Sequence, residues 1–276
     1  MQNTSELRLA VLIDADNVPS SNLQGMMEEI AKYGTPTFKR IYADWTKPHV
    51  TRWKSELLQH AITPIQQYSY TTGKNATDSA MIIDAMDILY TGKVDGFCII
   101  SSDSDFTRLA LRLREAGMKV IGMGQKKTPA PFIAACDKFV FIEILKGKRA
   151  EETHEEEKEK QETAETILEI DKKLVKLLSD TINDVADETG WAFLAEVGNL
   201  IIKKQPSFDP RNYGYKKLLL LLKGAEAFDI DERSVNKGNG NVKHVYVRIK
   251  AKKEARKTGK GNRRKKDDDV TIATEM

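Results

Sequence analysis

Aspartates lie at three points of this sequence where an apolar, strand-like run ends or a helical pattern begins. Asp14 comes directly after one apolar run, and Asp103 and Asp105 follow another apolar run and two serines. Asp78 opens a segment with helical spacing. Taken singly, these residues suit helix caps and turns equally well, because aspartate is favoured in both. Gathered at one place, they would bind a divalent cation, which stabilises charge on a phosphodiester.

Alternating strands and helices must position these residues. Strand-like apolar runs lie at 7–13, 37–43, 62–68, 97–100, 120–123 and 139–142. Helical spacing lies between them, at about 22–33, 49–60, 77–90, 106–116 and 130–135. Because such alternation is typical of a parallel sheet covered on both faces, we predict an α/β domain over residues 1–145.

This topology predicts that the acidic residues meet at one edge of the sheet. Asp14 and Asp103 follow strands, so both lie at the carboxyl edge, where open α/β sheets bind ligands. A crossover helix runs antiparallel to the strands, which places Asp78, in its first turn, at the same edge. Asp78 also shares the apolar stripe of its helix and should point inward. Asp84 and Asp87 lie on other faces of this helix, and we predict that they are solvated.

A carboxylate cluster of this kind favours a metal site over separate caps and turns. Like charges a few ångströms apart raise one another's pKa unless a cation neutralises them. Hard oxygen ligands, with no His or Cys among them, suit Mg²⁺ or Mn²⁺. We therefore predict Mg²⁺ or Mn²⁺ as the cofactor, held by Asp14, Asp78 and Asp103, with Asp105 as a further candidate.

Three motifs in this first domain resemble the NYN family of PIN-like nucleases. They are Leu-Ile-Asp14-Ala-Asp-Asn17 after the first strand, Lys74-Asn-Ala-Thr-Asp78 at a helix start, and Ser101-Ser-Asp103-Ser-Asp105-Phe106 before another helix. The resemblance implies a three-layer α/β/α PIN-like fold and a metal-dependent ribonuclease, with an endonucleolytic mode favoured. It implies a catalytic and metal-binding set of Asp14, Asp78, Asp103 and Asp105, with Asn17 orienting Asp14. Ser102 stands where the family often has Gly, which predicts a slightly crowded loop.

Two segments of extreme composition border a second domain. Residues 146–166 are strongly charged with few apolar side chains, which predicts a flexible or solvent-exposed helical linker. Residues 251–276 are basic and lack aromatic residues, which predicts a disordered tail. Such a tail either adds salt-sensitive affinity for nucleic acid or only keeps the protein in solution.

Residues 167–250, between these segments, have the pattern of a small winged-helix domain. Helical spacing is followed by two strand-like runs, 228–230 and 242–249, around a Gly- and Asn-rich turn. The words Gly190-Trp191, Val197-Gly198-Asn199-Leu200 and the string 206–215 resemble the LOTUS (OST-HTH) domain. The resemblance implies RNA binding, with protein contacts as an alternative role. The candidates for phosphate contact in this domain are Lys203, Lys204, Arg211, Lys216 and Lys217; in the first domain, Lys74 lies near the acidic edge and is a further candidate.

Composition limits the partners and the location that can be expected for this chain. The 44 basic and 41 acidic residues nearly balance, so the net charge of +3 says little about partners. The two cysteines make no disulfide framework and no zinc spacing, which favours a reducing, cytoplasmic location. No apolar run is long enough to cross a bilayer, so no membrane partner is expected.

The sequence therefore predicts a ribonuclease that hydrolyses RNA with Mg²⁺ or Mn²⁺ and holds RNA through its second domain. The main alternative is a non-catalytic, RNA-binding post-transcriptional regulator. A DNA-directed winged-helix protein is a third reading. A small-molecule phosphatase is less favoured, because it would leave the second domain and the basic tail unexplained.

Overall fold

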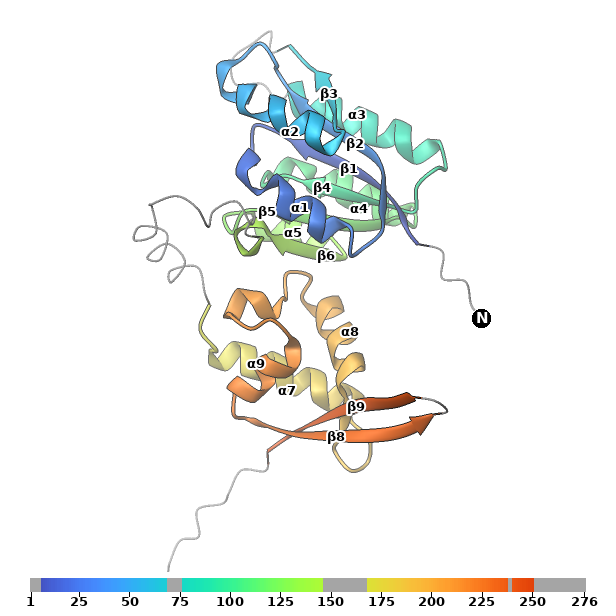
Figure 1. The fold of residues 1–276 in the computed structure, drawn as a ribbon, viewed down its shortest axis with the longest axis vertical. Coiled ribbons are helices and arrows are strands. Elements are labelled where there is room, and N and C mark those ends of the chain that lie inside the picture. Colours follow the sequence, from blue (N-terminus) through green and yellow to red (C-terminus); the bar gives the residue numbers. More distant parts are fainter. Residues whose placement is uncertain (1–5, 69–75, 146–167, 238–239, 251–276) are drawn as a thin grey trace, which may run out of the picture.

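The first half of the chain folds around a six-stranded parallel sheet. The computed structural model of the protein describes residues 6–68, 76–145, 168–237 and 240–250 (Figure 1). The strand order is β3-β2-β1-β4-β5-β6. The strands are β1 (Arg8–Asp14), β2 (Thr35–Ala43), β3 (Thr63–Gln66), β4 (Gly96–Ile100), β5 (Lys119–Gly124) and β6 (Lys138–Phe141).

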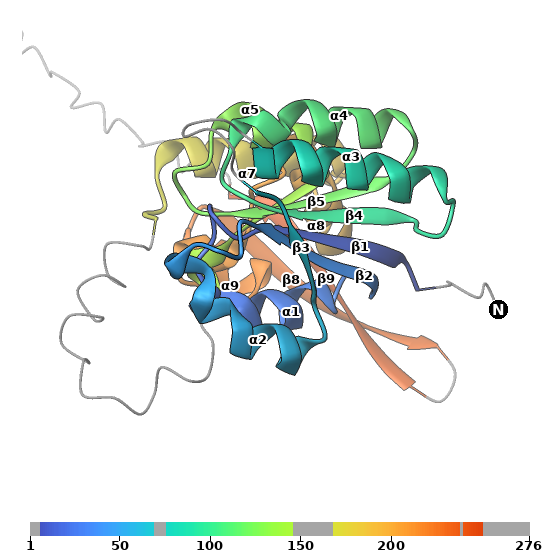
Figure 2. The same ribbon diagram turned by 90° about the horizontal axis from the view of Figure 1, so that it is seen from above.

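Helices cover both faces of this sheet, as Figure 2 shows. They are α1 (Leu23–Ile30), α2 (Trp53–His60), α3 (Ala76–Tyr90), α4 (Thr107–Glu115) and α5 (Ala130–Ala135). A hydrophobic core lies on each face of the sheet, and alternate residues of β1 pack into each of them. Val11 packs with α1 and α2, and Leu12 packs with α3, α4 and α5. Because both faces are buried, the strand is a continuous apolar run. The predicted three-layer α/β/α fold is confirmed.

Short 3-10 turns precede three of the predicted helices, and one of them, Ser20–Asn22, leads into α1. The predicted helix at 49–60 is split into a 3-10 turn, Pro48–Arg52, and α2, and the helix at 106–116 follows the turn Ser104–Phe106. The strand predicted at 62–68 is shorter, because only Thr63–Gln66 pair with β2.

Asp84 corrects one of the predictions. Its carboxylate accepts hydrogen bonds from the Arg40 guanidinium and the Tyr42 hydroxyl, both on β2, and it is half-buried. The predicted solvated position was wrong because α3 packs over β2, so this side of the helix faces polar side chains of the sheet. Asp87, one turn further along, is exposed as predicted.

Among its described residues, the second half contains three α-helices and a three-stranded antiparallel sheet of order β7-β9-β8. The elements are α7 (Lys172–Val185), β7 (Ala192–Phe193), α8 (Leu194–Lys204), α9 (Leu218–Gly224), β8 (Phe228–Lys237) and β9 (Gly240–Ile249). Asp171 caps α7 by accepting a hydrogen bond from the Leu174 amide at 2.7 Å. Leu178, Ile201 and Leu221 join the three helices in one core. Helices followed by a β-hairpin form the predicted winged helix, with a longer first strand than expected.

Within the described ranges, none of the helices has the length and apolar character needed to cross a bilayer. The predicted linker, 146–166, and the predicted tail, 251–276, lie outside the described residues.

Candidate active site

Three of the predicted aspartates come together at the carboxyl edge of the parallel sheet. Asp103 follows β4 and accepts a hydrogen bond from the Asp105 amide at 2.9 Å, which caps the turn leading into α4. Asp78 lies in the first turn of α3. Each of the three residues offers a carboxylate oxygen, and these oxygens all lie within 4.8 Å of one another. This spacing allows one cation to contact all three side chains.

Asp14 is close enough for its charge to raise the pKa of Asp78, but it is not one of the three members of the group. It ends β1, which pairs with β4, and it is 1 % exposed. Its Oδ2 accepts hydrogen bonds at 2.7 Å from both Asn17 Nδ2 and Ser101 Oγ, and its Oδ1 accepts one at 3.1 Å from the Asp16 amide. Asp14 is thus held in a fixed orientation by three donors.

The electrostatics of the site favour a bound cation. Burial, together with the charges of Asp14 and Asp103, raises the pKa of Asp78 to about 6. Burial also raises the pKa of Asp14, against the hydrogen bonds that it accepts from Ser101 and Asn17. Crowded carboxylates of this kind are relieved by a positive charge. An all-oxygen donor set matches the preference of Mg²⁺ and Mn²⁺, so the residues fit the predicted cofactor.

Comparison with known families assigns both halves of the chain. A family model described as the NYN domain matches residues 8–143, and one described as the OST-HTH/LOTUS domain matches residues 165–239. The chain is an NYN domain followed by an OST-HTH domain. The six-stranded parallel sheet with helices on both faces is thus the PIN-like fold of an NYN domain, and the winged helix is the OST-HTH domain.

Among solved structures, three bacterial proteins are similar to parts of the chain. A protein of unknown function from Vibrio parahaemolyticus is 22% identical, with 51% of this chain and 96% of that one covered and a TM-score of 0.43. An uncharacterised protein from Nitrosomonas europaea is 38% identical, with 29% and 74% covered and a TM-score of 0.26. A Chromobacterium violaceum protein is 29% identical, with 30% and 88% covered and a TM-score of 0.23. The curated proteins contain no match.

Ser101 is a site residue of the NYN domain that the sequence analysis did not single out. It is fully buried, and its hydroxyl donates to Asp14 at 2.7 Å while accepting from the Asp103 amide at 3.0 Å. Ser101 therefore connects the ends of β1 and β4. The available signal was a small hydroxyl residue at the point where a buried apolar strand stops. The neighbouring Ser102 hydroxyl accepts a hydrogen bond from the Gln125 amide at 2.9 Å, which ties the loop to the end of β5.

Replacing Ser101 with alanine tests this connection. The change leaves the Asp103 amide without its acceptor and Asp14 with one donor fewer, so we expect the free energy of unfolding to fall by about 1–3 kcal/mol. Thermal or denaturant unfolding would measure the loss. Ser101→Thr is the matched control, because it retains a hydroxyl at this position. An unchanged stability in Ser101→Ala would contradict the structural role of this residue.

The predicted phosphate-binding residues lie in different surroundings. Lys74 falls outside the described residues. Lys203 and Lys204 end α8, and Lys216 and Lys217 precede α9; all four are exposed, and Lys204 forms an ion pair with Asp184.

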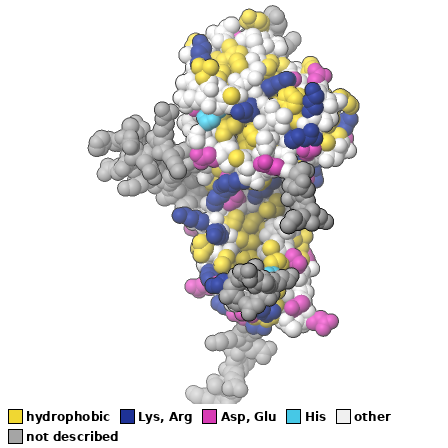
Figure 3. Space-filling view, turned by 45° about the vertical axis from the view of Figure 1, so that its right-hand side comes forward, with side chains coloured by type: hydrophobic (Ala, Val, Ile, Leu, Met, Phe, Trp, Pro, Cys, Tyr) yellow, Lys and Arg dark blue, Asp and Glu magenta, His cyan; other side chains and the backbone are white. Residues whose placement is uncertain are grey.

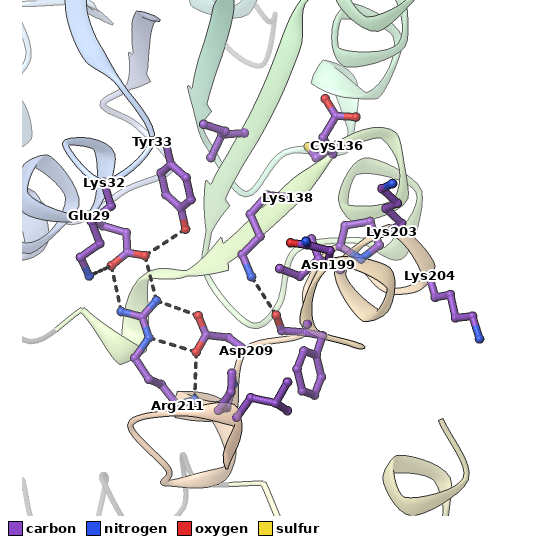
Figure 4. A pocket seen from close by; sticks show the side chains of 18 of the residues that line it. Glu29, Lys32, Tyr33, Cys136, Lys138, Asn199, Lys203, Lys204, Asp209 and Arg211 are labelled. Atoms are coloured by element: carbon purple, nitrogen blue, oxygen red, sulfur yellow. Dashed lines mark hydrogen bonds and ion pairs between the residues drawn. The ribbon is translucent and has the colours of Figure 1, made fainter. Parts of the chain in front are cut away.

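Arg211 lies between the two domains (Figure 4). Its guanidinium donates to both carboxylate oxygens of Glu29, on α1 of the NYN domain, at 2.8 Å each. It also contacts Asp209 at 2.7 and 3.0 Å, and its side chain is only 28% exposed. Arg211 was predicted to contact phosphate, but in the structure its charge is directed toward these two carboxylates.

Proposed function

We propose that this chain is a divalent-metal-dependent ribonuclease whose OST-HTH domain holds RNA. The observation that carries the proposal is the meeting of Asp78, Asp103 and Asp105 at the ligand-binding edge of an NYN domain. A protein that only binds RNA gains nothing from carboxylates that repel phosphate. The OST-HTH domain supports RNA as the substrate over DNA or a small phosphate ester.

In this proposal the residues have separate roles. Asp78, Asp103 and Asp105 hold Mg²⁺ or Mn²⁺, and Asp14 completes the acidic set. The ion supplies positive charge that stabilises the phosphodiester during hydrolysis. Asn17 and Ser101 fix the orientation of the Asp14 carboxylate through their two hydrogen bonds of 2.7 Å. The cytoplasmic location that the cysteine content favours is part of the same proposal.

Removing the metal tests the proposed activity. Purified protein is incubated with labelled single-stranded and structured RNA in Mn²⁺, in Mg²⁺ or in EDTA. We expect cleavage with either ion, none in EDTA, and recovery when the metal is added back. Binding is measured in parallel. RNA that is bound but uncut under all conditions would refute the nuclease and favour the RNA-binding regulator.

A further inference from the structure

The NYN and OST-HTH domains meet along the edge strand β6. The Phe139 amide donates to the Pro206 carbonyl at 2.9 Å. A loop of the OST-HTH domain therefore supplies a hydrogen-bond acceptor to the outer edge of the sheet. The buried Lys138 donates to the Phe208 carbonyl at 2.8 Å. With the Arg211–Glu29 ion pair, these contacts fix one domain against the other.

A basic cleft of about 1100 Å³ lies between the two domains. Of the described residues that line it, nine are Lys or Arg and three are Asp or Glu. Figure 3 shows Lys and Arg side chains on both domains near the boundary where they meet. The cleft therefore has an excess of positive charge that comes from both domains.

The three acidic residues of the cleft are already engaged by neighbouring groups. Glu29 accepts from Arg211, Lys32 and Tyr33, and Asp209 accepts from Arg211. Asp137 lies 3.1 Å from Arg114 and 3.9 Å from Lys119, and it accepts from a backbone amide. Their charges therefore offset only part of the basic surface.

The exposed cations of the cleft come from opposite walls. On the OST-HTH wall, Lys203, Lys216 and Lys217 form no ion pair with any described residue. On the NYN wall, Arg114 and Lys119 are 40% and 48% exposed, and both share the single carboxylate of Asp137. Lysine and arginine side chains on two facing walls are suited to the repeated phosphates of a nucleic-acid strand.

We propose that this cleft is one composite site for the phosphate backbone of single-stranded RNA, to which the NYN domain contributes Arg114 and Lys119. The inference rests on the proposed function and extends it, because RNA binding is then shared between the domains. The cleft and the acidic site also lie at opposite ends of the parallel sheet. Strand β5 runs from Lys119 at the cleft to Gly124, beside the loop of Ser101 and Ser102, a length of roughly 17 Å.

This separation means that the cleft holds a stretch of RNA away from the bond that is cut. Removing charge from the cleft should therefore weaken RNA binding and raise KM, while kcat at saturating RNA is retained. A cleft that only stabilised the fold would give neither this split nor a change in salt dependence.

The test measures RNA affinity of the full chain in EDTA, where no cleavage occurs, as a function of salt. We expect Arg114→Gln/Lys119→Gln to weaken binding about tenfold at low salt and to reduce the slope of log Kd against log salt by roughly 1.4, as for two lost phosphate contacts on a single strand. Lys216→Gln/Lys217→Gln should act similarly. The charge-retaining Arg114→Lys/Lys119→Arg should bind as the parent does, which separates loss of charge from damage to the fold.

A matched control is Lys54→Gln/Lys93→Gln, which removes two exposed lysines of the NYN domain outside the cleft. Parental affinity and salt slope in Arg114→Gln/Lys119→Gln would overturn the composite site, as would an equal loss in the control. The proposed nuclease would survive either result, because cleavage is scored separately with Mn²⁺. Conversely, a protein that never cuts RNA still gives a clear answer in this binding test.

Discussion

Replacing Asp103 with asparagine is expected to reduce metal-dependent RNA cleavage about a hundredfold or more. Residues that merely orient metal ligands typically contribute ten- to hundredfold, so a ligand should contribute at least as much. Asparagine keeps an oxygen that accepts from the Asp105 amide, which preserves the cap before α4. The loss should therefore come from charge at the site and not from unfolding. Initial cleavage rates in Mn²⁺ give the result, and RNA affinity in EDTA should be unchanged or slightly tighter.

The matched control for this variant is Asp87→Asn. Asp87 is an exposed carboxylate on α3, the helix that carries Asp78, so the same charge is removed outside the site. We expect it to cleave RNA at the parental rate. If Asp103→Asn also cut RNA as fast as the parent, the assignment of the three aspartates would be wrong.

Replacing Arg211 with alanine is expected to lower the free energy of unfolding by about 3 kcal/mol. Removing one partner of a buried ion pair costs about 3–5 kcal/mol, because the other charge is left buried without compensation. Glu29 is only 3% exposed and Asp209 10%, and both lose a cation, although Lys32 still contacts Glu29 at 2.6 Å. The lower end of the range therefore applies. Denaturant unfolding, followed by a probe in each domain, measures the change.

An exposed ion pair provides the control. Lys223 lies 3.5 Å from Glu232, and both side chains are about half exposed. Lys223→Ala should change stability by less than about 1 kcal/mol. If Arg211→Ala also lowered the free energy of unfolding by less than about 1 kcal/mol, the contact between the domains would contribute little to stability.

The pH dependence of stability gives a second measure of this contact. Although burial opposes ionisation, hydrogen bonds from Arg211 and Lys32 lower the pKa of Glu29 to about 2, from its ordinary value of 4.5. Because the folded pKa lies below the unfolded one, this stabilisation is complete above about pH 4.5 and is lost as the pH falls toward 2. In Arg211→Ala the loss of stability across that interval should be smaller than in the parent. Equal slopes would contradict the role of the pair.

Local patterns in the sequence were sufficient for the layers of the NYN domain. The run Leu9 to Ile13 is apolar throughout because helices cover both sides of β1, and the spacing of α3 shows which face packs inward. The same patterns predicted that Asp14, Asp78 and Asp103 lie at one edge, since that follows from the direction of the strands and of the crossover helix. The motifs added the family, which the matches to both domains bear out.

Other properties of the site depend on which distant segments become neighbours. The pairing of β1 with β4 places Ser101 between Asp14 and Asp103. The residues on either side of Ser101 in the sequence do not predict that contact. In the same way, Asp84 looks solvated on its helix until β2 supplies Arg40 and Tyr42.

The sequence by itself determined the alternation of strands and helices in the NYN domain, the sheet edge at which each aspartate lies and the two families, because each of these follows from patterns within single segments of the chain. Only the tertiary structure decided which three carboxylates share a cation-sized space and that Arg211 joins the two domains. The physical reason is that the pattern of burial along one element is local, whereas the partner of a charge is set by the packing of elements far apart in sequence.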